Sequence, residues 1–201
     1  AASYSLKAAD APLEAYLVNS AKDYEDIQAI KRGEKIYVLK DTGTELVYGR
    51  FSDDKNPMDV KPWEVYDILY EGAPTEYEMG LLLMASGKFE DARKQLELAG
   101  KQLDKSGKVF STTKAYRDYI DDKLLTCAMG LGERDTTKHL LDKLSKSGEA
   151  HAHVRSAIMY LELLSEGEAE DGKLMGKMAD SLLKLPLPPL LKGKVLVMKV
   201  L

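Results

Sequence analysis

The chain has 201 residues, which is enough for one sizeable domain or two small ones. Hydrophobic residues make up 44% and charged residues 31%, a mixture typical of soluble globular proteins. The net charge is -4, and no Lys/Arg cluster with interleaved aromatic residues occurs, which argues against a nucleic-acid partner. The longest apolar runs are far too short to cross a bilayer, so we expect no membrane-spanning segment.

Cysteine usage and the two ends of the sequence bear on location. The single cysteine, Cys127, excludes a disulfide within the chain and fits either a reducing cytoplasm or a bacterial periplasm. The small residues at 1–3 resemble the start of a mature chain after signal-peptide removal, or a remnant of cloning. We therefore expect an exported, periplasmic bacterial protein, with the cytoplasm as the alternative. Residues 194–201 are apolar with no polar tail, which indicates a sequence cut inside an element or, less favoured, an end covered by a partner.

The first third of the chain is rich in β-forming residues and turn signals. Candidate strands are 26–30, 35–39, 45–51 and 64–70. A glycine within 40–44 predicts a hairpin turn, and 52–62 reads as a polar loop with two prolines. Residues 11–21 predict either a short helix or an extended lead-in. The region 1–72 is therefore expected to hold a small antiparallel β-meander resembling an SH3-like half-barrel, too small to be stable unless it packs on the rest of the chain.

From Pro74 onward the spacing of apolar residues becomes helical. Candidate helices are 75–86, 88–105, 113–131, 135–146, 150–165, 168–185 and 189 onward. Glycine ends helices because the left-handed conformation costs it little, and glycines lie between these segments at 87, 107, 132, 148 and 167. Helical hairpins repeated in this way predict an α-solenoid over residues 73–201. The expected fold class is α+β.

The first hairpin carries a more specific pattern. Gly80 and Ala92 are small enough for the two helix backbones to approach closely, while larger apolar residues fill the space around them. The segment 73–106 resembles one tetratricopeptide repeat (TPR). The matching positions are Met79, Gly80, Leu83, Gly87, Phe89, Ala92, Leu96 and Ala99.

Later repeats match that family less well. Gly132 and Gly167 take the turn role of Gly87, at spacings of 45 and 35 residues. Leucine and alanine fill the core sites around Gly132, but Arg134 replaces the aromatic residue and Thr137 stands where alanine is usual. The sequence thus predicts three helical hairpins and the start of a fourth, with only the first a good match.

The resemblance implies a right-handed helical array whose concave face is lined by the first helix of each repeat. Proteins of this kind usually bind peptides or other proteins and rarely catalyse reactions. The implied concave positions are Tyr77, Leu81, Met84, Tyr119, Asp122, Thr126 and Met129, followed by Ala157, Leu161 and Leu164. Tyr and Met are adaptable contact residues. The alternative is that several of these side chains are core, packed on the β-meander or the next helix.

Motifs that could carry chemistry have simpler structural explanations. Residues 41–43 (Asp-Thr-Gly) match the short aspartic-protease signature, but the chain has no second copy to complete the dyad. His151 and His153 diverge by roughly 200° on a helix, so they could share a metal only in an extended segment. Cys127 lies among leucines, which favours a buried thiol over a nucleophile. The prolines of 184–189 favour a stiff connector over a polyproline ligand.

We therefore expect no catalytic residues, no cofactor and no metal site. The leading hypothesis is a non-enzymatic interaction or scaffold module that captures a protein segment on the concave face of the array. The alternative is a structural subunit of a homo- or hetero-oligomeric envelope assembly. In that alternative, the apolar face around 195–201 and an exposed strand edge mediate the assembly.

Overall fold

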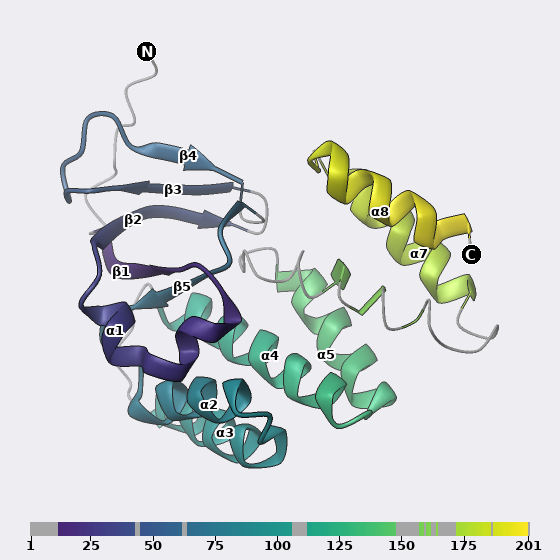
Figure 1. The fold of residues 1–201 in the computed structure, drawn as a ribbon, viewed down its shortest axis with the longest axis horizontal. Coiled ribbons are helices and arrows are strands. Elements are labelled where there is room, and N and C mark those ends of the chain that lie inside the picture. Colours follow the sequence, from purple (N-terminus) through teal and green to yellow (C-terminus); the bar gives the residue numbers. More distant parts are fainter. Residues whose placement is uncertain are drawn as a thin grey trace.

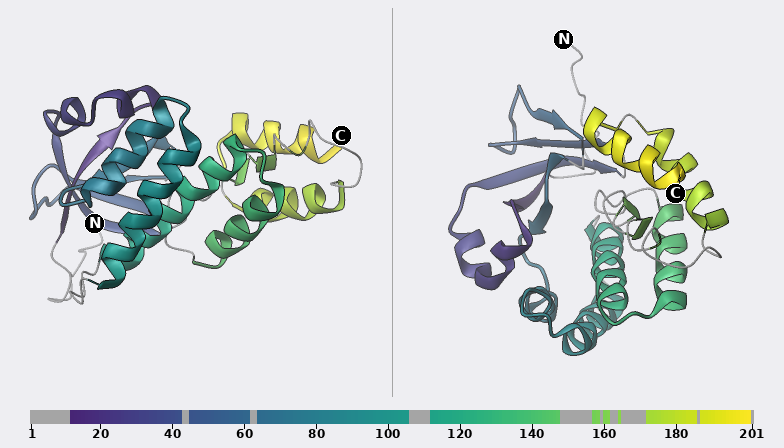
Figure 2. Two further views of the ribbon diagram at one scale, coloured as in Figure 1. Left: turned by 90° about the horizontal axis from the view of Figure 1, so that it is seen from below. Right: turned by 45° about the vertical axis from the view of Figure 1, so that its right-hand side comes forward.

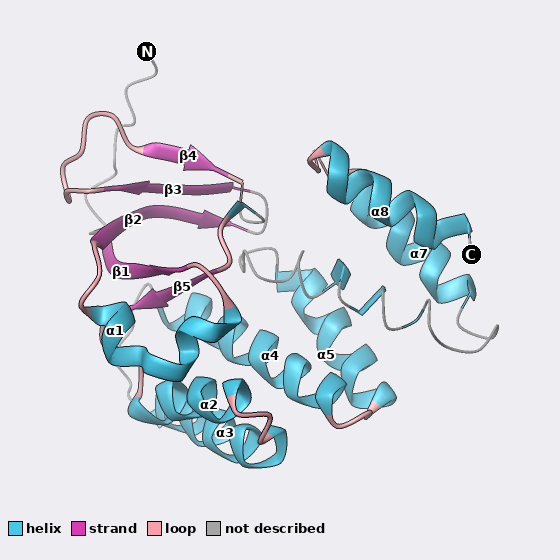
Figure 3. Cartoon of the chain, in the orientation of Figure 1, coloured by secondary structure: helices cyan, strands magenta, loops and turns pink. Residues whose placement is uncertain are grey.

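The chain folds into a β-sheet at one end and a succession of helices that leads away from it (Figures 1 and 3). This computed structural model describes residues 12–42, 45–61, 64–105, 112–147, 157–158, 160–161, 164, 172–185 and 187–200. The mixed α+β class expected from the sequence is confirmed.

The sheet has five antiparallel strands in the order β4-β3-β2-β1-β5. Their bounds are β1 (Leu13–Val18), β2 (Lys35–Thr42), β3 (Glu45–Gly49), β4 (Met58–Val60) and β5 (Asp67–Tyr70). The first four strands form a meander, and β5 returns to the free side of β1, where Val18 lies opposite Asp67. The segment predicted as a helix or lead-in is thus an interior strand.

The predicted strand at 26–30 is wrong, because this segment is helical. The 3-10 helix η1 (Ala21–Asp26) leads directly into α1 (Ile27–Lys31). Asp26 caps α1 by accepting a hydrogen bond from the backbone N–H of Ala29 at 2.9 Å. Tyr24, Ile27 and Ile30 are buried at a spacing of three, which places them on one helical face.

Two further boundaries in this region need correction. The predicted loop at 52–62 contains the short edge strand β4, and the predicted strand at 64–70 is a strand only from Asp67. A three-residue strand carries too little alternation for its sequence to distinguish it from a loop.

The helices lie close to their predicted bounds. They are α2 (Thr75–Ala85), α3 (Phe89–Lys105), α4 (Thr112–Gly130), α5 (Arg134–Ser147), α7 (Gly172–Leu183) and α8 (Pro189–Val200). The helix predicted at 150–165 is described only at 157–158, 160–161 and 164, and these residues are helical and buried. Gly87 and Gly132 have φ of 71° and 72°, which confirms their turn role. Gly107, Gly148 and Gly167 lie outside the described residues.

Close packing between successive helices depends on two glycines. A Cβ on Gly80 would lie 2.8 Å from the Leu96 side chain on α3, and one on Gly130 would lie 2.6 Å from the Phe89 ring. Met79 departs from its predicted role in the repeat, because it is 44% exposed. The predicted backbone approach of α2 to α3 is confirmed, and a second approach joins α3 to the end of α4.

Most of the buried apolar side chains in the described part of the chain belong to two clusters. The first joins the sheet, η1 and α1 to α2, α3 and three residues of α4, namely Tyr119, Ile120 and Cys127. The second joins Leu125 of α4 to α5, the described residues of 157–164, α7 and α8. The helices curve away from the sheet in an arc, so that the first cluster and α8 lie towards opposite ends of the molecule (Figures 1 and 2).

Candidate functional site

The predicted concave residues divide between the core and partly buried positions. Tyr77, Leu81, Tyr119 and Asp122 are at most 3% exposed, and Ala157, Leu161 and Leu164 are also buried. Met84, Thr126 and Met129 are partly buried. Placing Tyr77, Leu81, Tyr119 and Asp122 in an open binding groove therefore needs correction, because their side chains do not reach the surface of this structure.

The N-terminal unit itself covers this face of α2 and α4. Tyr77 and Leu81 share one apolar cluster with the sheet, and η1 packs against α2. The ring of Tyr119 meets that of Tyr70 on β5 edge-on, with centroids 5.5 Å apart. The helices therefore use their predicted binding face to hold the chain's own sheet.

A buried charge network fastens β5 to α4. The Lys123 ammonium contacts the carboxylate of Asp67, and it lies 3.1 Å from that of Asp122. The hydroxyl of Tyr24 donates to the same Asp67 carboxylate, which also accepts the backbone N–H of Ile68 at 2.8 Å. The ammonium lies 5.8 Å from the centre of the Tyr24 ring. Every charged group in the network contacts a partner. The network therefore has the arrangement expected of a structural contact between β5 and α4.

The pKa shifts of this network follow from its burial and its charges. Burial opposes the charge of Lys123, but the anionic Asp67, with Tyr24 and Asp122, outweighs it and raises the pKa of Lys123 well above its ordinary value. Burial and the charge of Asp67 raise the pKa of Tyr24 well above its ordinary value as well. At neutral pH the network therefore holds an ammonium and a neutral phenol.

Among the described residues, the reactive side chains that the sequence singled out do not form a metal-binding group. Cys127 is buried, and burial raises the pKa of its thiol to about 11. His139 is exposed on α5, while His151, His153, Gly43 and the side chain of Asp41 lie outside the described residues. No group of three or more His, Cys, Asp and Glu that could hold a metal occurs among the residues that are described.

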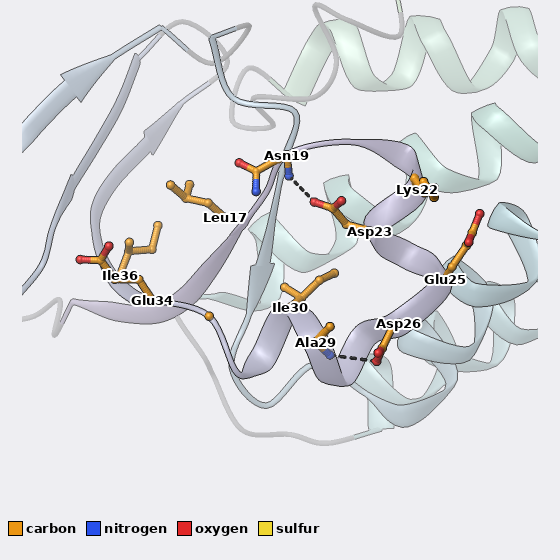
Figure 4. A pocket seen from close by; sticks show the side chains of 11 residues that line it. Leu17, Asn19, Lys22, Asp23, Glu25, Asp26, Ala29, Ile30, Glu34 and Ile36 are labelled. Atoms are coloured by element: carbon orange, nitrogen blue, oxygen red, sulfur yellow. Dashed lines mark hydrogen bonds between the residues drawn. The ribbon is translucent and has the colours of Figure 1, made fainter.

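An open hollow of about 660 Å³ lies between η1–α1 and the adjoining strands (Figure 4). We call it the α1 pocket. Leu17 on β1, Ile36 on β2, and Ala29 and Ile30 on α1 contribute its apolar surface. The remaining lining residues are Asn19, Lys22, Asp23, Glu25, Asp26, Gly33 and Glu34, so four carboxylates and one ammonium surround it. Its charge is therefore predominantly negative.

Three of the four carboxylates are held in place. Asp23 accepts the backbone N–H of Asn19 at 2.7 Å, and this bond lowers the pKa of its carboxyl. Asp26 caps α1, and Glu34 lies 3.2 Å from the exposed Arg50 guanidinium. Glu25 is exposed on η1 beside them. A ligand would meet an acidic rim around an apolar floor, in which Asp26 and Glu34 already pair with exposed arginines.

A second hollow of about 450 Å³ lies at the junction of α5, α7 and the helical residues Ala157 and Tyr160. Its lining is mainly apolar, and Lys138 and Lys177 stand with Asp142 among its polar residues. Because charges of both signs line this hollow, they indicate the charge of a ligand less clearly than the acidic rim of the α1 pocket does.

Comparisons with known proteins identify no relative. No protein-family model, no curated protein and no solved structure matches the chain. Within the described residues, no helix is both long enough and apolar enough to cross a membrane.

The α1 pocket was not predictable from the sequence pattern alone. Reading 26–30 as a strand separates Asp26 from Asp23 and Glu25, although all three lie on one η1–α1 segment. One usable signal was present: Ser20 followed by Asp23 is a capping box, which marks a helix start.

Proposed function

We propose that this chain is a non-enzymatic protein-interaction module, built from a TPR-like helical array and an SH3-like β unit that covers part of the array's concave face. The α2–α3 hairpin supports the array, since Gly80 packs against Leu96 and Gly87 makes a left-handed turn. The covered face moves the proposed binding surface away from Tyr77 and Tyr119. Export to a bacterial periplasm remains a prediction from the sequence.

The observation that carries the proposal is the α1 pocket. An apolar floor under a ring of carboxylates fits a protein segment that offers an apolar side chain flanked by Lys or Arg. The apolar side chain would fill the hollow, and the cations would face Asp23, Glu25 and Glu34. Association would be weak to moderate, because the hollow alone is smaller than a stable protein interface.

A direct test uses a fluorescent peptide of leucine and lysine in helical spacing, titrated with the full chain. We expect saturable binding, with amide NMR shifts concentrated in residues 17–36. The same peptide with glutamate in place of lysine should not bind. Glu25→Lys should weaken binding about fivefold, which corresponds to about 1 kcal/mol for an exposed charge contact.

A matched variant controls for the net negative charge of the chain. Glu97→Lys reverses an exposed glutamate on α3, outside the pocket, and should leave the affinity unchanged. Equal weakening by Glu97→Lys and Glu25→Lys, or NMR shifts centred elsewhere, would show that the α1 pocket is not the binding surface.

A further inference from the structure

An exposed apolar surface lies on α8, a helix that is separate from α1 in the fold (Figure 1). Three of its apolar side chains are solvent-exposed: Leu190 at 84%, Val197 at 62% and Leu196 at 45%. Val195 and Met198, which the sequence placed on the same apolar assembly surface, are instead buried against the second cluster. The exposed side chains, which we call the α8 face, therefore lie on the side of the helix away from its own core.

The α8 face and the α1 pocket carry opposite charges. Helix α8 contains three lysines and no acidic residue, and one of them, Lys199, pairs with Asp180 of α7 at 2.6 Å. Lys192 and Lys194 are exposed on the same helix as Leu190. Residues 12–72 contain thirteen acidic and eight basic residues, with four of the acidic ones around the α1 pocket.

We propose that the α8 face of one copy of this chain docks in the α1 pocket of a second copy. This inference rests on the proposed function and names the partner of that same pocket. Leu190 is the anchor, because among the described residues it is the most exposed large apolar side chain, and it lies in the first turn of α8. The partial positive charge of the helix N-terminus adds to the attraction of Lys192 and Lys194 for the acidic rim.

The position of the two surfaces fixes the kind of assembly. They are different patches of one molecule, so a contact between them is heterologous and a pair of copies keeps one free α8 face and one free pocket. Association therefore continues from copy to copy, and the mean mass rises with concentration. Because the contact is between opposite charges at the surface, salt weakens it.

Sedimentation velocity on the full chain tests this, between about 10 and 500 μM. We expect the mean mass to rise with concentration at 50 mM NaCl and the rise to weaken at 500 mM. Leu190→Glu should abolish the rise, since it removes the anchor and faces the acidic rim with another carboxylate. A glutamate in the first turn also suits the helix dipole, so α8 should stay folded.

Mixing two variants separates head-to-tail docking from other modes of association. The double variant Glu25→Lys/Glu34→Lys reverses two charges of the acidic rim and blocks the pocket while leaving the α8 face intact, and Leu190→Glu does the reverse. Each variant alone should stay monomeric, and an equimolar mixture should form a one-to-one heterodimer. Leu98→Glu on α3, where Leu98 is 45% exposed, is the matched control and should associate like the wild type.

The outcomes also separate this inference from the proposed function. A wild-type chain that stays monomeric while its α1 pocket binds the Leu/Lys peptide overturns the self-docking and leaves the proposed function standing. Wild-type association with a mixture that forms no heterodimer also overturns the self-docking. A monomeric chain that fails to bind the peptide overturns both.

Discussion

At the scale of single residues, two glycines inside helices set how closely neighbouring helices pack. Gly80 faces Leu96, and Gly130 faces the Phe89 ring, at separations that leave no room for a methyl group. Gly100, in the interior of α3, has nothing within 4 Å of the position of a Cβ. The same residue type therefore serves packing at the first two positions and has no packing role at the third.

This difference predicts opposite effects of one substitution. Gly80→Ala should destabilise the chain by about 1 kcal/mol, because overpacking against Leu96 outweighs the gain in helix propensity. Gly100→Ala should stabilise it by about 0.5–1 kcal/mol, because the propensity gain is unopposed. The urea midpoints of the two variants measure both changes. A Gly80→Ala variant as stable as Gly100→Ala would contradict the close approach of α2 to α3.

At the scale of elements, the buried network of Asp67, Lys123 and Tyr24 joins three segments that are distant in sequence. It connects β5, α4 and η1, and the ion pair between Lys31 and Glu78, at 2.5 Å, adds a contact from α1 to α2. Breaking a buried pair by removing one partner leaves a carboxylate without its cation. The sheet is therefore bound to the helices by charge as well as by apolar packing.

Lys123→Met tests this network. The variant should lose about 3–5 kcal/mol of unfolding free energy at pH 7, because Asp67 and Asp122 lose their cation. The raised pKa values of Lys123 and Tyr24 add a pH signature. Their stabilisation is complete below about pH 10, where these groups titrate in the unfolded chain, and is lost as the pH rises towards the folded values.

Denaturant unfolding at several pH values measures both effects. The wild type should lose stability above about pH 10, and its advantage over Lys123→Met should shrink there. An advantage that grows with alkalinity would contradict the assignment of a charged Lys123 in the folded state.

The same scale shows what the sequence could predict. The bounds of α2, α3, α4 and α5 follow from local signals: apolar spacing and glycine turns. The covering of Tyr77 and Tyr119 does not, because it depends on a sheet that reaches α4 through Asp67, a residue distant in sequence from Lys123. The α1 pocket was missed because 26–30 alternates well enough to suggest a strand, although the Asp26 cap determines a helix.

At the scale of the whole molecule, the two apolar clusters predict two cooperative units. The sheet with α1 to α4 should open as one unit, and α5 to α8 as another with a lower opening free energy, since fewer elements support it. Native-state hydrogen exchange should therefore give two values of the opening free energy. The amides of β5 and α2 should share one value, and those of α7 and α8 should share a lower one. Lys123→Met should lower the first value. A single value for all these amides would show that the clusters unfold together.

The buried thiol has a practical consequence for spectroscopy. Cys127 is the only cysteine, it is fully buried, and its pKa of about 11 leaves little thiolate at neutral pH. The native thiol should therefore react only slowly with thiol-specific labels. A cysteine placed at the exposed Glu25 or Leu190 would take up a probe alone, so distances between labelled copies could be measured without first removing a native thiol.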